Sequence, residues 1–406
     1  MNAKIKSLGM AEFVILLAAM ISIVALATDV MLPALDVIGA ELGVTDPNDA
    51  QLVISSLFLG FAVGQLVAGP LSDSFGRKPV IYLGYAIFII GCLLSLYATN
   101  WSMMIVGRVL QGLGAASPRI VTLALVRDSY SGRSMARIMS ITMSVFILVP
   151  AIAPALGQVV IFAGGWQATF VLLIVTAFVT GLWFMARQPE TLLPEKRIKF
   201  SLRSIGQGTL VVCASRVAMG YTIATGLIFG AFLGYLSTAQ QVFQITFQSG
   251  NLFAVYFALA ALAIGAASVV NSLLVMRLGM RALTWWAMIG VTVLAIGFLV
   301  IVQMSEGVPS FALFMVWLLA SFFCVGILFG NMNAIAMEPL GAIAGLGAAL
   351  VGSISNFIAL PLGWVIGDHF DGGVTSLVMG FAVLGAASLG VVMWAERGPN
   401  AEGEQA

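Results

Sequence analysis

The sequence predicts an all-α polytopic membrane protein, with twelve transmembrane helices in two pseudo-symmetric six-helix halves. The first observation behind this fold class is composition. The 406 residues are 61% hydrophobic and only 9% charged, whereas soluble domains hold roughly 45–50% apolar and about 25% charged residues. The second is length, because twelve helices of ~20 residues leave room for loops but for no separate soluble domain. The third is the distribution of charge between the helices, described below.

Twelve apolar runs follow one another along the chain, each long enough to cross a bilayer. They are residues 11–35, 50–70, 79–98, 102–126, 136–162, 166–186, 211–236, 251–275, 281–303, 309–336, 342–366 and 373–395. The longest polar interruption separates six runs from six. It predicts an N-terminal half of residues 1–187, a cytoplasmic linker of residues 188–204 and a C-terminal half of residues 205–406. Residues 200–212 have room for a short interfacial helix.

The basic residues predict the orientation of the chain. Fifteen of the 18 Lys and Arg residues, among them Lys4, Lys6, Arg133 and Lys196, fall at the termini or in loops on one side of the predicted spans. The other three are Arg108, Arg119 and Arg216, which fall within or at the margins of spans. The positive-inside rule makes the basic side cytoplasmic. We therefore expect a multi-pass membrane protein with both termini in the cytoplasm.

Several classes of function are disfavoured by the residues that the chain lacks. Its three cysteines are far apart and lie in or beside apolar runs, which favours packing over a disulfide frame or a metal cluster. His369 is the only histidine and falls in a predicted loop, so a Ser-His-Asp hydrolase would depend on it alone. We expect no enzymatic activity, no catalytic residues, no metal site, no cofactor and no nucleic-acid partner.

A weak internal repeat relates the two halves. The segment 272–281 lies half a chain after the segment 69–78, and each follows the second span of its half. Gly76 then matches Gly279, and Lys78 matches Arg281. Two like-oriented halves are typical of alternating-access transporters, whose substrate site lies between the halves near the membrane midplane.

Three motifs resemble those of one transporter family, the major facilitator superfamily. They are Gly69-Pro-Leu-Ser-Asp-Ser-Phe-Gly-Arg-Lys78, Arg108-Val-Leu-Gln-Gly-Leu-Gly-Ala-Ala116 and Pro150-Ala-Ile-Ala-Pro-Ala-Leu-Gly157. They resemble its loop-2/3 signature, its helix-4 signature and the helix-5 signature of its proton antiporters. Three shorter segments are similar to the bicyclomycin/chloramphenicol-resistance (Bcr/CflA) branch of the drug:proton antiporters: 28–33, 125–128 and 336–340. The resemblance covers nearly the whole chain and implies the major facilitator fold.

Asp29 and Arg108 are the predicted proton-coupling residues and also predicted substrate-binding residues. Counted at 1.5 Å per residue, they lie ~9 Å and ~10 Å from the outer ends of their spans, so at similar depth. A charged carboxylate inside a span is costly unless it protonates, pairs or faces water. The alternatives are that Asp29 is interfacial or ends its helix in a turn with Pro33, and that Arg108 binds backbone carbonyls of the first span. Gln111 shares the helix face of Arg108 and is included in the substrate site.

Two further groups of residues are predicted to serve conformational change. The gating motif consists of Gly69, Asp73, Gly76, Arg77, Lys78 and Arg127. Gly76 permits a positive φ in the tight turn, and Asp73 can pair with Arg77 or with Arg127. The resemblance implies that this motif is a latch on the inner side. The antiporter helix motif consists of Pro150, Pro154 and Gly157, which can bend the helix and allow close packing; the alternative is an ordinary proline-kinked span.

The remaining candidates are less sharply defined. Five side chains of the second half are predicted to complete the substrate site: Tyr221, Thr225, Tyr235, Asn331 and Asn333. Glu338 is expected to cap or gate, and Glu12, Arg119 and Arg216 to face the inner interface, Arg119 by snorkelling. Whether these four take part in coupling is left open.

The function predicted from these residues is secondary active export of lipophilic small molecules, including antibiotics, in exchange for protons. Only one acid lies on the cavity side of the first span, which favours neutral or weakly charged compounds. The alternative is a proton-coupled metabolite importer or exporter, because a fold does not determine its substrate. The expected partners are an amphipathic small molecule, protons and membrane lipids, with the protein acting as a monomer. The substrate and the stoichiometry are not determined by the sequence.

Overall fold

The computed structural model describes residues 9–397, except the side chains of residues 132, 133, 136, 140, 143, 144, 147, 196, 202, 204, 251 and 342. Lys4 and Lys6 of the predicted basic side lie outside the described residues, as do the side chains of Arg133 and Lys196. Among the described residues, eleven segments are long and apolar enough to cross a membrane. The twelfth long helix, α6 (Gly132–Gly164), contributes the apolar stretch Leu148–Gly164. The protein is therefore an all-α, multi-pass membrane protein, as predicted.

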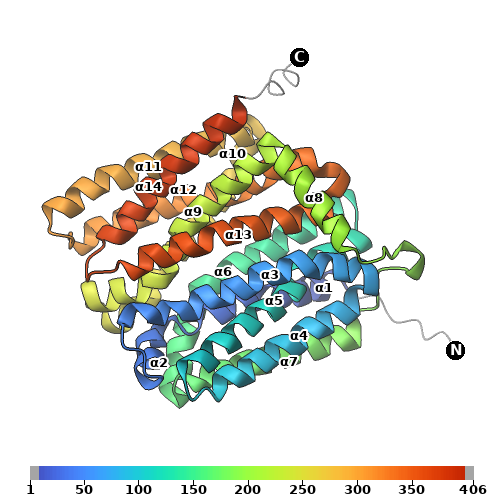
Figure 1. Cartoon of the computed structure of the whole chain (residues 1–406), viewed down its shortest axis with the longest axis horizontal. Coiled ribbons are helices and arrows are strands. Elements are labelled where there is room, and N and C mark those ends of the chain that lie inside the picture. The colour runs from blue at the N-terminus through green and yellow to red at the C-terminus, as the bar shows by residue number, and fades with distance from the viewer. Residues whose placement is uncertain (1–8, 398–406) are drawn as a thin grey trace. The chain divides into compact units, whose positions relative to one another are not determined.

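The chain divides into two compact units, residues 1–202 and 203–406, and the division falls inside the predicted linker. The first unit, blue to green in Figure 1, has six long helices, here with the shorter elements in chain order. They are α1 (Met10–Asp29), η1 (Leu32–Ala34), α2 (Leu35–Glu41), η2 (Pro47–Gln51), α3 (Leu52–Phe75), α4 (Arg77–Leu96), α5 (Trp101–Ser129), α6, α7 (Gln167–Arg187) and η3 (Pro194–Lys196).

The second unit, yellow-green to red in Figure 1, also has six long helices and one shorter helix. Its elements are α8 (Leu202–Ala214), α9 (Arg216–Gln241), η4 (Val242–Thr246), η5 (Gly250–Leu252), α10 (Phe253–Leu278), α11 (Met280–Met304), α12 (Phe311–Met337), η6 (Glu338–Ile343), α13 (Ala344–Asp368) and α14 (Thr375–Glu396). The helix α8 occupies the segment in which the sequence left room for a short helix.

The internal repeat is visible in how the helices pack. In the first unit α3 packs on α5, α1 on α6 and α4 on α7. In the second unit the helices at equivalent places make the same pairs, α10 with α12, α9 with α13 and α11 with α14. The turns that join α3 to α4 and α10 to α11 also match, because Gly76 has φ 105° and Gly279 has φ 80°. Only glycine adopts such a conformation at little cost. Gly76 therefore has the positive φ that the sequence allowed for it.

The first span differs from its prediction. The sequence predicts one helix over 11–35, but α1 ends at Asp29 and the chain turns before η1 and α2. Pro33 explains the break, because it has no N–H to donate to the carbonyl of residue 29 and so cannot continue the helical ladder. Asp29 is consequently the last residue of α1. This agrees with the alternative in which Asp29 ends its helix in a turn with Pro33.

The helix α5 is held tightly against α3. A Cβ at Gly60 of α3 would overlap the carbonyl oxygen of Val109, and one at Gly112 of α5 would overlap that of Leu57. Small residues at such crossings let helix backbones approach closely, which is how membrane helices gain packing contacts. The position of α5 relative to α3 is thereby fixed, and with it the position of the arginines that α5 carries.

Candidate functional site

The Arg108 side chain is completely buried in the first unit and binds three acceptors. Its Nε donates to the carbonyl oxygen of Val53 on α3 at 2.9 Å, and its Nη2 to that of Ala27 on α1 at 3.0 Å. Its Nη1 donates to Oε1 of Gln111 on the same helix at 2.6 Å. The guanidinium therefore links α5 to both α1 and α3.

The end of α1 explains why a cation is needed here. The last carbonyls of a helix have no partner within the helix, and a basic side chain can bind them and offset the negative end of the helix dipole. Ala27 lies in the last turn of α1, two residues before Asp29. Arg108 thus binds a backbone carbonyl of the first span, as in the structural alternative that the sequence allowed.

Gln111 extends this network to a fourth helix. Its Nε2 lies 2.9 Å from Oγ of Ser95 and 3.2 Å from the carbonyl oxygen of Gly91, both on α4. The Gln111 side chain is completely buried, and buried polar groups are stable in a membrane when they are bonded in this way. Arg108 and Gln111 together therefore act as a polar junction of α1, α3, α4 and α5.

Asp29 lies beside this junction but does not join it. Its side chain is 4% exposed, and within residues 9–397 its carboxylate makes no hydrogen bond or ion pair. The expected contact between Asp29 and Arg108 is therefore not formed in this structure, because backbone carbonyls and Gln111 occupy the guanidinium. A buried carboxyl group without a partner depends on water access for its charge.

The antiporter helix motif packs against the residue that follows Asp29. A Cβ at Gly157 of α6 would overlap the carbonyl oxygen of Val30, so glycine is required for this approach. Pro150 and Pro154 both lie inside α6, which continues as one helix through them. Gly157 of the motif thus packs against the turn at the end of α1, one residue after Asp29.

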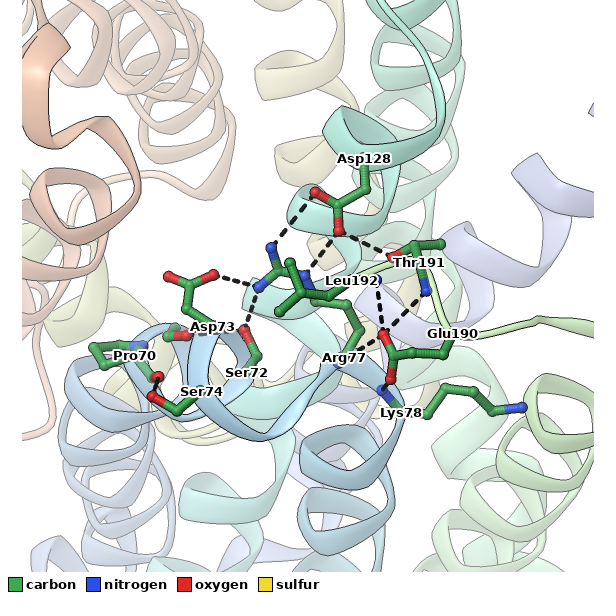
Figure 2. A network of polar contacts seen from close by, with 11 residues as sticks. Pro70, Ser72, Asp73, Ser74, Arg77, Lys78, Asp128, Glu190, Thr191 and Leu192 are labelled. Carbon is green, nitrogen blue, oxygen red and sulfur yellow. Dashed lines mark hydrogen bonds and ion pairs between the residues drawn. The ribbon is translucent and has the colours of Figure 1, made fainter. Parts of the chain in front are cut away.

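A second polar network surrounds Arg77 at the turn between α3 and α4 (Figure 2). The side chain of Arg77 is 6% exposed and forms ion pairs with Asp73 and with Asp128, the latter at 2.9 Å. It also donates to Oγ of Ser72 at 2.9 Å. Of the two pairings that the sequence allowed for Asp73, the one with Arg77 is formed. Arg127 has no such contact among the described residues, and its neighbour Asp128 at the end of α5 binds Arg77 instead.

Glu190 completes this network and was missed by the sequence analysis. Figure 2 shows its carboxylate accepting four backbone N–H groups, each at 3.0 Å. Two are at the start of α4, from Arg77 and Lys78, and two are its own neighbours, Thr191 and Leu192. A carboxylate at a helix N-terminus is favoured by the helix dipole. Glu190 therefore fastens the predicted linker to α4, and its place directly after the sixth span was the available signal.

The second unit has a comparable network around Arg281. Its guanidinium lies 2.7 Å from Glu338 and 3.2 Å from Glu396, and the hydroxyl of Tyr221 donates to Glu396 at 2.7 Å. The acids lie at or just after the ends of the fourth and sixth long helices of their unit, as Asp128 and Glu190 do in the first unit. The Arg281 side chain is 47% exposed, so this network is the more solvated of the two. Tyr221, predicted to bind substrate, belongs to this network instead.

The other substrate-binding candidates of the second unit are dispersed. The hydroxyl of Thr225 donates to the backbone of its own helix at 2.7 Å. Tyr235 is buried and packs on the ring of Phe322, with 4.7 Å between the ring centroids. Asn331 exchanges two amide hydrogen bonds, 2.7 and 3.0 Å long, with Asn271 on α10. Of these predicted residues, only Asn333 is exposed. Asn271 was missed, because an isolated amide in an apolar run gives little sequence signal.

The remaining acids and bases are placed as follows. Glu12 forms an ion pair with Arg187 at 2.7 Å, between the start of α1 and the end of α7. Arg216 is the first residue of α9 and lies over the ring of Trp394, 4.7 Å from its centroid. Arg119 lies deeper in its helix and is treated below. Among the described residues, no cluster of His, Cys, Asp or Glu could hold a metal ion.

Comparison with known proteins identifies the class and then the family. Two units with the same helix packing and buried ionisable groups in their spans are the features of a secondary transporter. The Major Facilitator Superfamily matches residues 16–363. The chain belongs to this superfamily.

Similar proteins agree with this assignment. A bicyclomycin resistance protein homolog of Haemophilus influenzae is 28% identical over 83% of this chain and 84% of its own length. Multidrug resistance protein D of Escherichia coli is 26% identical, over 85% and 86%. An uncharacterized transporter of the superfamily, YdgK of Bacillus subtilis, is 26% identical, over 90% and 88%.

Solved structures show the same fold. The xylose transporter XylE from E. coli, in a partially occluded inward open conformation, has a TM-score of 0.74. It is 12% identical and is matched over 96% of this chain and 98% of that chain. A D-xylose-proton symporter has a TM-score of 0.72 at 14% identity, over 97% and 99%.

Proposed function

We propose that this protein exports lipophilic small molecules from the bacterial cytoplasm in exchange for protons, and that Asp29 carries the proton. The observation that carries the proposal is the Asp29 carboxyl group at the end of α1, which is buried and has no partner among the described residues. The names of the relatives from H. influenzae and E. coli support drugs as the class of substrate. The antiporter motif on α6, which packs against Val30, supports exchange.

The proposed cycle uses Asp29 and Arg108 in different ways. Arg108 holds the end of α1 through Ala27, two residues before Asp29. Proton entry from outside neutralises Asp29 and favours substrate release, and proton loss to the cytoplasm resets the site. One charge that crosses 100 mV supplies ~2.3 kcal/mol, and a tenfold gradient costs ~1.4 kcal/mol. One proton per cycle can therefore sustain a gradient of some tens-fold.

The two arginine networks are proposed to stabilise the state in which the cytoplasmic side is closed. The Arg77 network joins α3, α4, α5 and the linker, and the Arg281 network joins the start of α11 to the ends of α12 and α14. Each consists of ion pairs that can break and reform. In this proposal the protein is a monomer of the inner membrane with both termini in the cytoplasm.

The decisive experiment is proton flux in proteoliposomes that contain a pH-sensitive dye. Lipophilic antibiotics are added to wild type, to Asp29→Asn and to Asp36→Asn, whose acid is exposed seven residues further on. We expect drug-dependent proton movement opposite to the drug in wild type and Asp36→Asn, and loss of at least about 90% of it in Asp29→Asn, because an amide cannot bind and release a proton.

The same assay tests the alternative of a metabolite transporter. Flux that persists in Asp29→Asn would contradict the role of Asp29 and direct attention to Glu338. Protons that move together with the compound would contradict export. If no antibiotic moves protons, the metabolite transporter becomes the better explanation.

A further inference from the structure

Arg119 is a half-buried cation inside α5 that the proposed cycle does not use. It lies ten residues before the end of α5 at Ser129, or about 15 Å at 1.5 Å per residue. Arg119 therefore lies well inside α5, away from the charged residues at the end of the helix. Its Nη1 is buried and has no hydrogen-bond partner among the described residues. Its guanidinium carbon instead lies over the ring of Phe146 on α6, 4.6 Å from the centroid.

The contrast with Arg108 on the same helix makes Arg119 unusual. Arg108 donates to two backbone carbonyls and to Gln111, so its charge is fully used in holding helices together. Within residues 9–397, Arg119 makes no hydrogen bond or ion pair. A cation in a membrane span is costly, by ~2.5–3.5 kcal/mol on insertion scales. The contact with Phe146 is the stabilising interaction of the Arg119 guanidinium among the described residues, and no hydrogen bond adds to it.

The contact with Phe146 leaves the enclosed Nη1 of Arg119 without a hydrogen-bond acceptor among the described residues. The N–H groups of arginine lie in the plane of the guanidinium, so a ring that covers its face does not use them. The ring also holds the side chain in place through a cation–π interaction. Phe146 lies fourteen residues into α6, or about 21 Å, so both partners are well inside their helices. The aromatic ring of Phe146 therefore lies next to Nη1 of Arg119, an N–H donor without an acceptor among the described residues.

We propose that Arg119 and Phe146 recognise lipophilic substrates in which an aromatic ring carries an anionic oxygen group, such as a carboxylate or a phenolate. The oxygen accepts from Nη1 of Arg119, and the aromatic part packs on Phe146. This inference rests on the proposed transport function and names its substrate class. It narrows the expectation of neutral or weakly charged compounds, which considered only the acid on the first span.

The test measures equilibrium binding to the purified full-length protein in detergent, with 1-naphthoate and its neutral counterpart 1-naphthamide as probes. We expect wild type to bind 1-naphthoate at least about tenfold more tightly than 1-naphthamide, because a hydrogen bond between charged groups contributes that much. Arg119→Gln should bind both probes with similar affinity. Phe146→Leu should weaken both probes, because it removes the ring on which they pack.

The matched control is Arg216→Gln, which also removes an arginine stacked on an aromatic ring but at the end of a helix. It should retain the wild-type preference. The thermal unfolding midpoint of each variant checks its fold. If Arg119→Gln does not fold, Arg119→Lys decides, since it keeps the charge but loses the planar donor edge and should show a preference reduced at least about threefold.

The outcomes separate this inference from the proposed function. An equal preference in wild type and Arg119→Gln, or no preference or no binding of 1-naphthoate by wild type, would overturn the inference. If neutral antibiotics still exchange with protons in that case, the proposed function stands. If 1-naphthoate binds through Arg119 but no compound exchanges with protons, anion recognition stands and proton-driven export fails.

Discussion

Two arginines on one helix illustrate how neighbours decide what a residue does. Arg108 and Arg119 both interrupt the apolar run of α5. Arg108 lies at the end of α1, where the carbonyl oxygen of Ala27 accepts a hydrogen bond from its guanidinium. Arg119 meets the ring of Phe146, which offers no acceptor. An arginine side chain therefore has a structural role at position 108, whereas at position 119 we propose that it binds a ligand.

Replacing Arg108 should destabilise the first unit. Arg108→Gln leaves the carbonyl of Ala27 without its donor, which costs about 1–3 kcal/mol. It also removes a charged hydrogen bond to the carbonyl of Val53, which keeps the Ser56 hydroxyl as a donor. We expect a loss of about 2–5 kcal/mol in the free energy of unfolding, measured by chemical denaturation in detergent. Arg127→Gln, at an exposed position of the same helix, is the control and should unfold like wild type. Equal stability of both variants would contradict the capping role of Arg108.

At the scale of elements, the start of α4 is held from outside its own helix. The N–H groups in the first turn of a helix have no intrahelical acceptor, and Glu190 supplies one from the linker. Gly76 permits this approach, because a Cβ there would lie 2.8 Å from the Glu190 carboxylate. The predicted linker is therefore part of the first unit at its beginning.

Glu190→Gln tests this anchor. One oxygen of the carboxylate would become an NH₂ group facing backbone N–H donors, so we expect a loss of about 1–3 kcal/mol of stability. Faster proteolytic cleavage of the linker should accompany it. Glu195→Gln, at an exposed position of the same linker, is the matched control. If both variants are cleaved at the wild-type rate, Glu190 does not anchor the linker.

At the scale of the whole molecule, the chain repeats one packing plan. Both units pair the same helices and turn at a glycine of positive φ. Each also places acids at or just after the ends of its fourth and sixth long helices, around an arginine that lies after its second. An even number of spans in each unit brings the chain back to the side from which it started. The networks of Arg77 and Arg281 are therefore expected on the same side of the membrane.

Thiol labelling measures this orientation. Thr45→Cys and Glu195→Cys place cysteines at exposed positions in loops predicted on opposite sides. The background is Cys213→Ser, which removes an exposed native cysteine. A membrane-impermeant reagent applied to intact spheroplasts should label residue 45 and not residue 195, because the positive-inside rule places the basic linker in the cytoplasm. The opposite pattern would reverse the proposed topology.

Hydrophobicity and charge spacing determined the helical class, the helix positions, the short helix before α9 and the turn at Gly76. These features depend on neighbours in the sequence and on the solvent, so the sequence contains them. The tertiary structure alone decided which polar groups meet. Arg108 donates to the carbonyl of Ala27 and not to Asp29. Glu190 accepts hydrogen bonds from the start of α4. Those contacts join residues far apart in the chain, and their formation depends on which acceptors the packed helices bring within about 3 Å.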